Sequence, residues 1–215
     1  MKLVHGGDTV GYRERYGHDA LDFSANVSPL GVPEAVARAI GEAAFQADQY
    51  PDPLCRALTA ALSRTEAVPK AWILCGNGAA DLIFRLALSE KPKHALVLAP
   101  TFAEYAAALE TVDCEIHRHM LREENDFALT DDVLNAIEPP IDMVFLCQPN
   151  NPTGQAADRA LMRRILAKCE VVGALLVVDE CFLDFLPDSE AWTMKPDLAA
   201  HANLFILKAF TKLYG

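Results

Sequence analysis

The sequence predicts an α/β fold with a mainly parallel sheet, covered on both faces by helices in three layers. Short apolar segments alternate with helical segments from about residue 71 to residue 207, as in a succession of βα units. Several apolar segments end directly in polar or glycine-rich turns. The carboxyl ends of parallel strands meet at one edge of the sheet, where open α/β folds bind their ligands, so we expect the functional site at this edge.

Residues 1–31 are predicted to form an irregular N-terminal arm, and residues 32–215 a large domain. The arm contains the glycine-rich segment His5-Gly6-Gly7 and ends in the turn formers Pro29-Leu30-Gly31, which disfavour regular structure. A helix is expected over 33–47, because Pro33 suits a first turn and apolar residues recur at helical spacing. A second helix is expected over 53–64.

Six strands and four further helices follow in alternation. Strands are predicted at 71–75, 94–99, 114–119, 141–147, 174–178 and 204–207. Helices are predicted from 79, over 102–111, over 130–138 with an N-terminal cap, and over 158–172.

The amino-acid composition and net charge indicate a globular protein and disfavour some kinds of partner. The 215 residues are 52% apolar and 23% charged, an ordinary globular balance. The net charge of −11 disfavours nucleic acid and anionic membranes as partners. Six cysteines without metal-type CxxC spacing favour reduced, buried thiols. With neither a membrane-spanning apolar run nor a signal-peptide pattern, a cytoplasmic location is expected.

Two strand ends offer groups that could contact a flat, anionic ligand. Gly76-Asn77-Gly78 opens a predicted helix, whose first amides, at Ala79 and Ala80, are suited to bind phosphate. An ordinary strand–helix turn explains this segment equally well. Phe102 follows another strand and could stack on a planar ring, although a core aromatic is the commoner role for a phenylalanine.

Three more strand ends carry polar side chains. Asn151 lies in the turn-rich segment Pro149-Asn150-Asn151-Pro152-Thr153-Gly154, which alone reads best as a plain turn. Asp179 closes an apolar strand, either as a helix cap or as the partner of a protonated pyridine nitrogen. Thr211-Lys212 follows the last strand and places a candidate Schiff-base amine at the same edge.

A phosphate cradle, a stacking ring, an amide, a carboxylate and an amine, in this order, describe a pyridoxal-phosphate site. The sequence resembles the fold-type-I pyridoxal-phosphate enzymes of the histidinol-phosphate aminotransferase group, most closely the threonine-phosphate decarboxylases of cobalamin synthesis. The segments that carry the resemblance are His-Gly-Gly at 5–7, Asp-Phe-Ser-Ala-Asn-Val-Ser-Pro-Leu-Gly at 22–31, Gly-Asn-Gly at 76–78, Phe-Ala-Glu-Tyr at 102–105, Pro-Asn-Asn-Pro-Thr-Gly at 149–154, Asp-Glu-Cys-Phe at 179–182 and Thr-Lys at 211–212.

The resemblance implies a role for each matching residue of the cofactor site. Lys212 would hold pyridoxal 5'-phosphate covalently and move protons, and Asp179 would bind its ring nitrogen. Asn151 would bind the phenolic oxygen, and Phe102 would stack on the ring. The phosphate would be held by the amides of Ala79 and Ala80 and the hydroxyl of Thr211.

The resemblance also implies a homodimer and a substrate site. Tyr50 would reach the cofactor phosphate of a neighbouring subunit. His5, Gly6 and Asn26 match the substrate site of the decarboxylases, whose substrate is a small phosphorylated amino acid.

The sequence departs from the aminotransferases of this group at two positions. Phe182 stands where they usually have a tyrosine that donates to the phenolic oxygen, and this change favours the decarboxylases. Ala209 stands where a phosphate-binding hydroxyl is usual. The chain also stops three residues after Lys212, before the phosphate-binding arginine and the small C-terminal domain of the family. We therefore expect an incomplete large domain.

Three functions remain open from the sequence. The favoured one is decarboxylation of O-phospho-L-threonine to aminopropanol phosphate. The second is an aminotransferase acting on histidinol phosphate or a related amino acid, and the third is an inactive fragment. No metal is expected: His117 and His119 share one face of a strand, but no third ligand has suitable spacing, so a solvated edge strand is the better interpretation.

Overall fold

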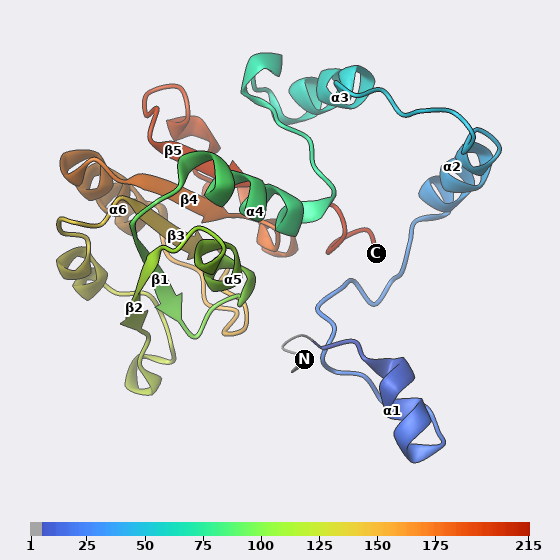
Figure 1. Cartoon of the computed structure of the whole chain (residues 1–215), viewed down its shortest axis with the longest axis horizontal. Coiled ribbons are helices and arrows are strands. Elements are labelled where there is room, and N and C mark those ends of the chain that lie inside the picture. The colour runs from blue at the N-terminus through green and yellow to red at the C-terminus, as the bar shows by residue number, and fades with distance from the viewer. Residues whose placement is uncertain (1–5) are drawn as a thin grey trace.

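The structure is a computed structural model that describes residues 6–215, and its centre is a sheet of five parallel strands (Figure 1). The strands are β1 (His94–Ala99), β2 (Glu115–Met120), β3 (Met143–Cys147), β4 (Leu175–Asp179) and β5 (Leu204–Leu207). They lie in the order β2-β1-β3-β4-β5. This arrangement confirms the predicted α/β fold. The order reverses between β1 and β3, and such a reversal opens a crevice at the carboxyl ends of the strands.

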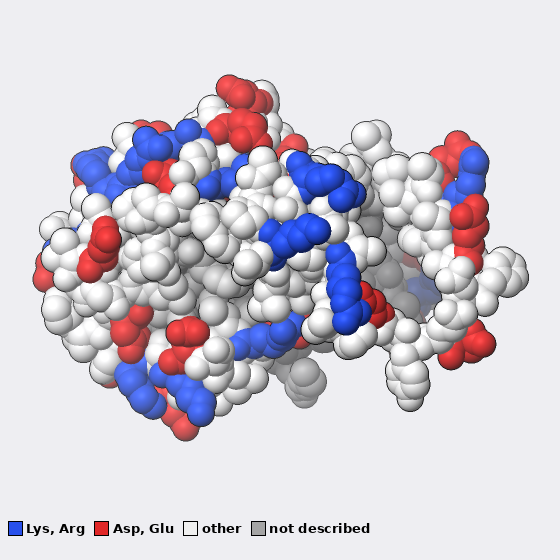
Figure 2. Space-filling model, turned by 90° about the horizontal axis from the view of Figure 1, so that it is seen from above, with Lys and Arg blue, Asp and Glu red and all other residues white. Residues whose placement is uncertain are grey.

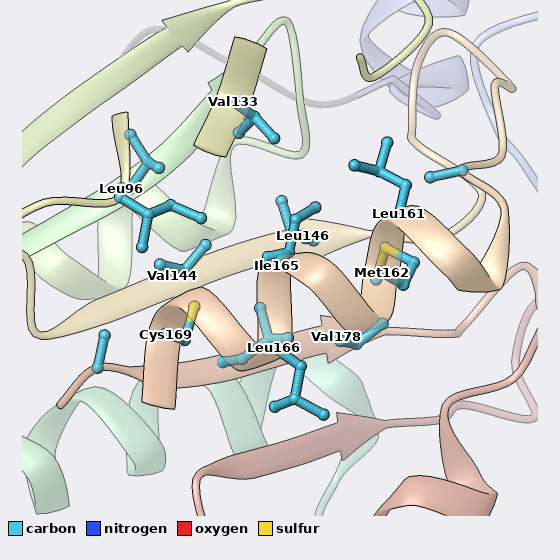
Figure 3. Packing of buried hydrophobic residues seen from close by; sticks show 14 of the residues in the cluster. Leu96, Val133, Val144, Leu146, Leu161, Met162, Ile165, Leu166, Cys169 and Val178 are labelled. Carbon is cyan, nitrogen blue, oxygen red and sulfur yellow. The ribbon is translucent and has the colours of Figure 1, made fainter. Parts of the chain in front are cut away.

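One face of the sheet is covered by α6 (Arg159–Val172) and the 3-10 helix η3 (Asp131–Ala136). The helix α6 begins where Asp158 caps it, its carboxylate accepting the Leu161 amide at 2.7 Å, and ends at Gly173 in the left-handed conformation. Its apolar side chains, including Ile165 and Leu166, pack on Val144 of β3 and Val178 of β4 (Figure 3).

The other face is covered by α4 (Gly78–Glu90) and α5 (Glu104–Glu110). Ile83 of α4 and Leu109 of α5 are fully buried with Val97 and Phe145 of the strands. Strands β3 and β4 are therefore buried on both sides, which explains why their sequences are apolar without alternation.

The N-terminal part carries three helices outside the two layers that cover the sheet (Figure 1). They are α1 (Thr9–Tyr16), α2 (Glu34–Ala44) and α3 (Arg56–Glu66), and none of them contains a buried residue. In Figure 2 the surface is hollowed between the sheet domain and this N-terminal part. On the same face, Lys and Arg side chains are interspersed with Asp and Glu, so the net charge of −11 is not gathered into one patch there.

The structure differs from the predicted elements in the arm. Residues 9–16 form α1, whereas an irregular segment was predicted. Its apolar residues do not repeat at helical spacing, but its caps were visible: Asp8 accepts the Gly11 amide at 2.9 Å, and Gly17 ends the helix with φ of 75°.

Two other predicted elements are wrong. The strand expected over 71–75 is replaced by the 3-10 helix η1 (Lys70–Trp72) and an unpaired extended segment. Ile73 and Leu74 line a cavity of about 200 Å³ with Phe205 and Ile206, so this segment faces β5 without pairing to it. The capped α-helix expected over 130–138 is the 3-10 helix η3. The predicted cap does not form, because the Thr130 hydroxyl bonds the Asp132 carboxylate instead of leaving its oxygen to a backbone amide.

The remaining short 3-10 helices lie in the connections. They are η2 (Glu123–Asn125), η4 (Leu183–Phe185), η5 (Ser189–Ala191) and η6 (Lys195–Asp197). Within residues 6–215, no helix combines the length and the apolar character that crossing a membrane requires.

Candidate active site

A cavity of about 200 Å³ opens at the carboxyl edge of the sheet. Its walls include seven residues that the sequence predicted for a cofactor site: Ala79, Ala80, Phe102, Asn151, Asp179, Thr211 and Lys212. They come from the start of α4 and from the segments that follow β1, β3, β4 and β5. Because these strands are parallel, segments more than a hundred residues apart meet at one place.

Asp179 is the buried anionic group of this cavity. The last residue of β4, it is 3% exposed. One carboxylate oxygen accepts the Tyr105 hydroxyl at 2.6 Å, and the other accepts the Cys181 amide at 3.0 Å. Burial and the neighbouring Asp179 raise the pKa of Tyr105 well above its usual value, so this hydroxyl keeps its proton and remains a donor. The carboxylate is thereby held in one orientation.

The neighbouring carboxylate, Glu180, has a structural role. Successive side chains of a strand point to opposite faces, and Glu180 turns away to accept the Thr193 hydroxyl at 2.7 Å and the Met194 amide at 2.8 Å. Burial raises its pKa. Of the two adjacent acids, Asp179 lines the cavity at the strand ends and Glu180 anchors the loop after η5.

The start of α4 supplies backbone donors to the same cavity. Gly78 has φ of 77°, a conformation that favours glycine, and lets the chain turn sharply into the helix. The first amides of a helix have no partner within it and carry the positive end of its dipole. Ala79 and Ala80 lie in this first turn and line the cavity, so their amides are suited to an anionic group.

The loop after β3 is held by its own buried amides. Gln148 donates to the Ala157 carbonyl at 2.6 Å and accepts the Ala157 amide at 2.9 Å. Asn150 accepts the Thr101 hydroxyl at 2.9 Å and donates to the Pro100 carbonyl at 3.0 Å. The loop is thus tied to the segment after β1, and this fixes the backbone on which Asn151 sits.

Lys212 reaches the cavity from the segment after β5. Its amine lies 5.6 Å from the centre of the Phe182 ring, within the range of a cation–π contact. Its carbonyl accepts the Ser28 amide at 2.8 Å, so the N-terminal segment holds the backbone at this lysine. Phe182 has no hydroxyl, and the ring therefore gives the site an apolar wall where a tyrosine would provide a hydrogen-bond donor.

A second cavity of about 400 Å³ adjoins the first and shares Asn151 and Phe182 with it. The N-terminal segment forms its other wall with Ala25, Asn26 and Val27. The Asn26 amide donates to the Asn151 side-chain oxygen at 3.1 Å. The predicted substrate residue Asn26 and the predicted cofactor residue Asn151 are therefore in direct contact.

Comparison with known proteins agrees with this geometry. The profile of the family described as "Aminotransferase class I and II" matches residues 18–215. The chain belongs to this family. It is 42% identical to the threonine-phosphate decarboxylase of Salmonella typhimurium over 195 residues, which are 91% of this chain and 53% of the relative.

Solved structures of other proteins share the fold. The histidinol-phosphate aminotransferase of Clostridium acetobutylicum matches with a TM-score of 0.80 and 26% identity, over 91% of this chain and 57% of the other. The histidinol-phosphate aminotransferase of Sinorhizobium meliloti, solved in complex with pyridoxal-5'-phosphate, matches with a TM-score of 0.81 and 22% identity, over 100% and 58% of the two chains. The chain spans about half the length of the curated relatives it matches.

Three residues predicted from the resemblance lie away from this cavity or outside the described chain. Tyr50 is fully exposed between α2 and α3 and does not line either cavity. Gly6 packs against Ser24, where an added Cβ would lie 2.4 Å from the serine Cβ. His5 lies outside the described residues. The contact of Tyr50 with a neighbouring subunit remains a prediction.

Sequence reasoning missed Tyr105 and Cys147, which lie at or behind the wall of this cavity. Tyr105 lies one helical turn after Phe102, and the centres of the two rings are 5.6 Å apart; this spacing was the available signal. Cys147 pairs in register with Asp179 and lines the cavity. Burial, with a smaller contribution from Asp179, raises the pKa of Cys147 to about 12, so its thiol stays protonated. Only the strand register, which the sequence does not show, places it there.

Proposed function

We propose that this chain forms the cofactor-binding part of a pyridoxal-phosphate-dependent enzyme. One observation carries the proposal: a buried carboxylate, a free helix N-terminus and a lysine amine, each from a different element, line one cavity at the carboxyl edge of the sheet. A group with a basic ring nitrogen, an aldehyde and a phosphate needs these three partners.

The residues present fit each part of that group. The Asp179 carboxylate would hold the ring nitrogen in its protonated form, and Tyr105 would keep that carboxylate in place. The amides of Ala79 and Ala80 and the Thr211 hydroxyl would hold the phosphate. Lys212 would hold the aldehyde carbon covalently. Phe102 and Asn151 would contact the ring and its phenolic oxygen.

Bound pyridoxal phosphate supplies an electron sink for the electron pair released when a bond at the substrate α-carbon breaks. The remaining work belongs to the chain. When it does not hold the aldehyde carbon, the Lys212 amine would carry a proton. Lys212 lines the cavity beside the Phe182 ring, where it would deliver that proton to the α-carbon.

Within this class, we propose decarboxylation of O-phospho-L-threonine. The bond between the α-carbon and the carboxylate breaks, carbon dioxide leaves, and a proton returned to the same carbon yields aminopropanol phosphate. The 42% identity to a threonine-phosphate decarboxylase supports this choice. Phe182 also supports the decarboxylase, because a phenylalanine lacks the hydroxyl that a tyrosine would donate to the phenolic oxygen.

The adjoining cavity of about 400 Å³ is the proposed place for the rest of the substrate. Asn26 and Asn151 face each other there, and their side-chain N–H groups would donate to a carboxylate or a phosphate. His5 and Gly6 complete the proposed substrate group. A homodimer, with Tyr50 reaching the site of the other subunit, is part of the same proposal, and the exposure of Tyr50 leaves it accessible for that contact.

The test compares two reactions on purified protein loaded with pyridoxal phosphate. We expect release of carbon dioxide from O-phospho-L-threonine, lost in Lys212→Ala. Keto-acid-dependent amino transfer from histidinol phosphate, without release of carbon dioxide, would favour the aminotransferase suggested by the similarity to the Clostridium acetobutylicum enzyme. If neither reaction occurs although the cofactor binds, the decarboxylase proposal fails for this chain and the cofactor proposal stands.

A further inference from the structure

Two histidines and a glutamate meet at the edge of the sheet, at the opposite ends of the strands from the active site. His94 and Glu115 are the first residues of β1 and β2, and His117 follows two residues later. In residues 6–215 this is the only group of three or more His, Cys, Asp or Glu side chains whose potential ligand atoms converge, all within 4.8 Å of one another.

The strand register produces this convergence. In the parallel pair β1–β2, His94 lies opposite Glu115 and Leu96 lies opposite His117. Side chains two residues apart on a strand share a face, so all three ligand residues are on one side of the sheet. The His117 Nε2 atom lies 3.4 Å from His94 Nδ1, and the Glu115 oxygens lie 3.4 Å from His94 Nδ1 and 3.5 Å from His117 Nε2.

The neighbouring histidine, His119, does not belong to this group. His119 shares the face of His117, but its nearest acidic neighbour is Asp132, at 3.6 Å. A search for ligands along one strand pairs His117 with His119 and finds no third ligand. The residues that converge with His117 come instead from the adjacent strand (His94) and from the start of its own strand (Glu115).

The chemistry of the three side chains defines the ligand. Imidazole nitrogens suit zinc, nickel and copper, whereas magnesium and calcium prefer sites made of oxygen atoms alone. Two histidines and one carboxylate form a common three-ligand set for zinc and leave a fourth position open. The three side chains are partly exposed, with 30%, 65% and 37% of their surfaces accessible for His94, Glu115 and His117, so an ion can reach them from solvent.

We propose that His94, Glu115 and His117 bind a divalent transition-metal ion, with zinc as the probe of choice. The ion joins the edge strand β2 to β1, because its ligands come from both strands. It is separate from the proposed cofactor chemistry, since it lies at the amino ends of the strands. The open fourth position takes water.

The test measures zinc binding by titration calorimetry on the untagged, purified chain. We expect one zinc ion per chain, with affinity reduced at least about tenfold in His94→Gln and in His117→Gln, since each variant removes one of three ligands. His201→Gln is the matched control: His201 also faces a carboxylate, Glu170, at 3.4 Å, but belongs to no convergent group of three among the described residues. Its zinc affinity should equal that of the unmodified chain.

A second readout separates this site from binding at cysteines. Cobalt at a site with two histidines and one glutamate should show visible d–d absorption without a thiolate charge-transfer band. Circular dichroism and denaturant unfolding without metal would verify that the variants fold. Zinc binding that persists unchanged in the His94→Gln, His117→Gln double variant, a thiolate band, or no binding at micromolar zinc would each overturn the proposal.

Discussion

The sheet domain and the N-terminal part both contain helices with apolar side chains, but these side chains are buried only in the sheet domain. In the sheet domain, helices α4, α5 and α6 each bury at least three side chains against strands. Helices α1, α2 and α3 bury none, and side chains such as Ile40, Phe45 and Leu54 stay exposed. Apolar spacing therefore predicts α2 as well as α6, whereas burial depends on a facing surface, which only the sheet provides within the described chain.

This contrast predicts unequal costs for the same substitution. Ile165 of α6 is fully buried, and Ile165→Ala should lower the free energy of unfolding by about 2–5 kcal/mol, because it leaves a cavity in the core. Ile40 of α2 is 62% exposed, and Ile40→Ala should change the free energy of unfolding by less than about 0.5 kcal/mol. Denaturant unfolding of both variants measures the difference. Equal losses would show that α2 is packed against a surface in solution.

The cysteines should show the same contrast in their reactivity. Burial raises the pKa of Cys147 and of Cys169 to about 12 in the sheet domain, whereas Cys55 and Cys75 are partly exposed. Alkylation requires the thiolate and access to it. We expect Cys55 and Cys75 to react at least about a hundredfold faster at neutral pH in the native protein. Mass spectrometry of peptides after timed alkylation gives the rates, and simultaneous labelling of all four would contradict the burial of the sheet-domain thiols.

At the active site, Asp179→Asn should keep the fold and reduce turnover. The amide retains the shape, with its oxygen accepting the Cys181 amide and its NH2 donating to the Tyr105 oxygen, but it lacks the charge that holds a protonated ring nitrogen. A hydrogen bond to a charged group contributes about 1.5–3 kcal/mol, so we expect turnover to fall about 10- to 150-fold. Asp184→Asn, at an exposed position near Lys208, is the matched control. If the Asp179 variant turns over as fast as the control, Asp179 has only a structural role.

The smallest expected effect concerns one of the contacts that join the two parts of the molecule. Asn26 belongs to the N-terminal segment, and its amide donates to Asn151 in the sheet domain. Asn26→Ala removes one exposed hydrogen bond, worth about 0.5–1.5 kcal/mol, and should raise KM about two- to tenfold while cofactor affinity stays the same. Asn125→Ala on η2 serves as a distant control. A fall in cofactor affinity of the same size would mean that Asn26 supports the cofactor site instead.

Much of the sheet domain was predictable because its signals are local. The strands 94–99 and 204–207 have the predicted bounds, and α6 begins and ends at the residues its caps indicate. Phe102, Asn151, Asp179 and Lys212 could be placed at one edge because each ends or follows an apolar strand. Parallel topology brings such positions together without further information.

The predictions failed where structure depends on distant partners. A strand over 71–75 requires a neighbour for its backbone groups, and the described chain provides no pairing there. The register between β1 and β2 is likewise absent from the local pattern, so the meeting of His94 with His117 could not be foreseen. The same holds for Tyr105 and Asp179, which are 74 residues apart.

The assignment of Lys212 is tested most directly by reducing the protein with borohydride in the presence of pyridoxal phosphate and mapping the labelled peptide. Lys212 lines the cavity that contains Asp179, whereas Lys208 faces Glu66, at 3.3 Å, in a different cavity. The account predicts a single stable label on Lys212, abolished in Lys212→Ala and retained in Lys208→Ala. A label on Lys208, or no label on the chain, would contradict it.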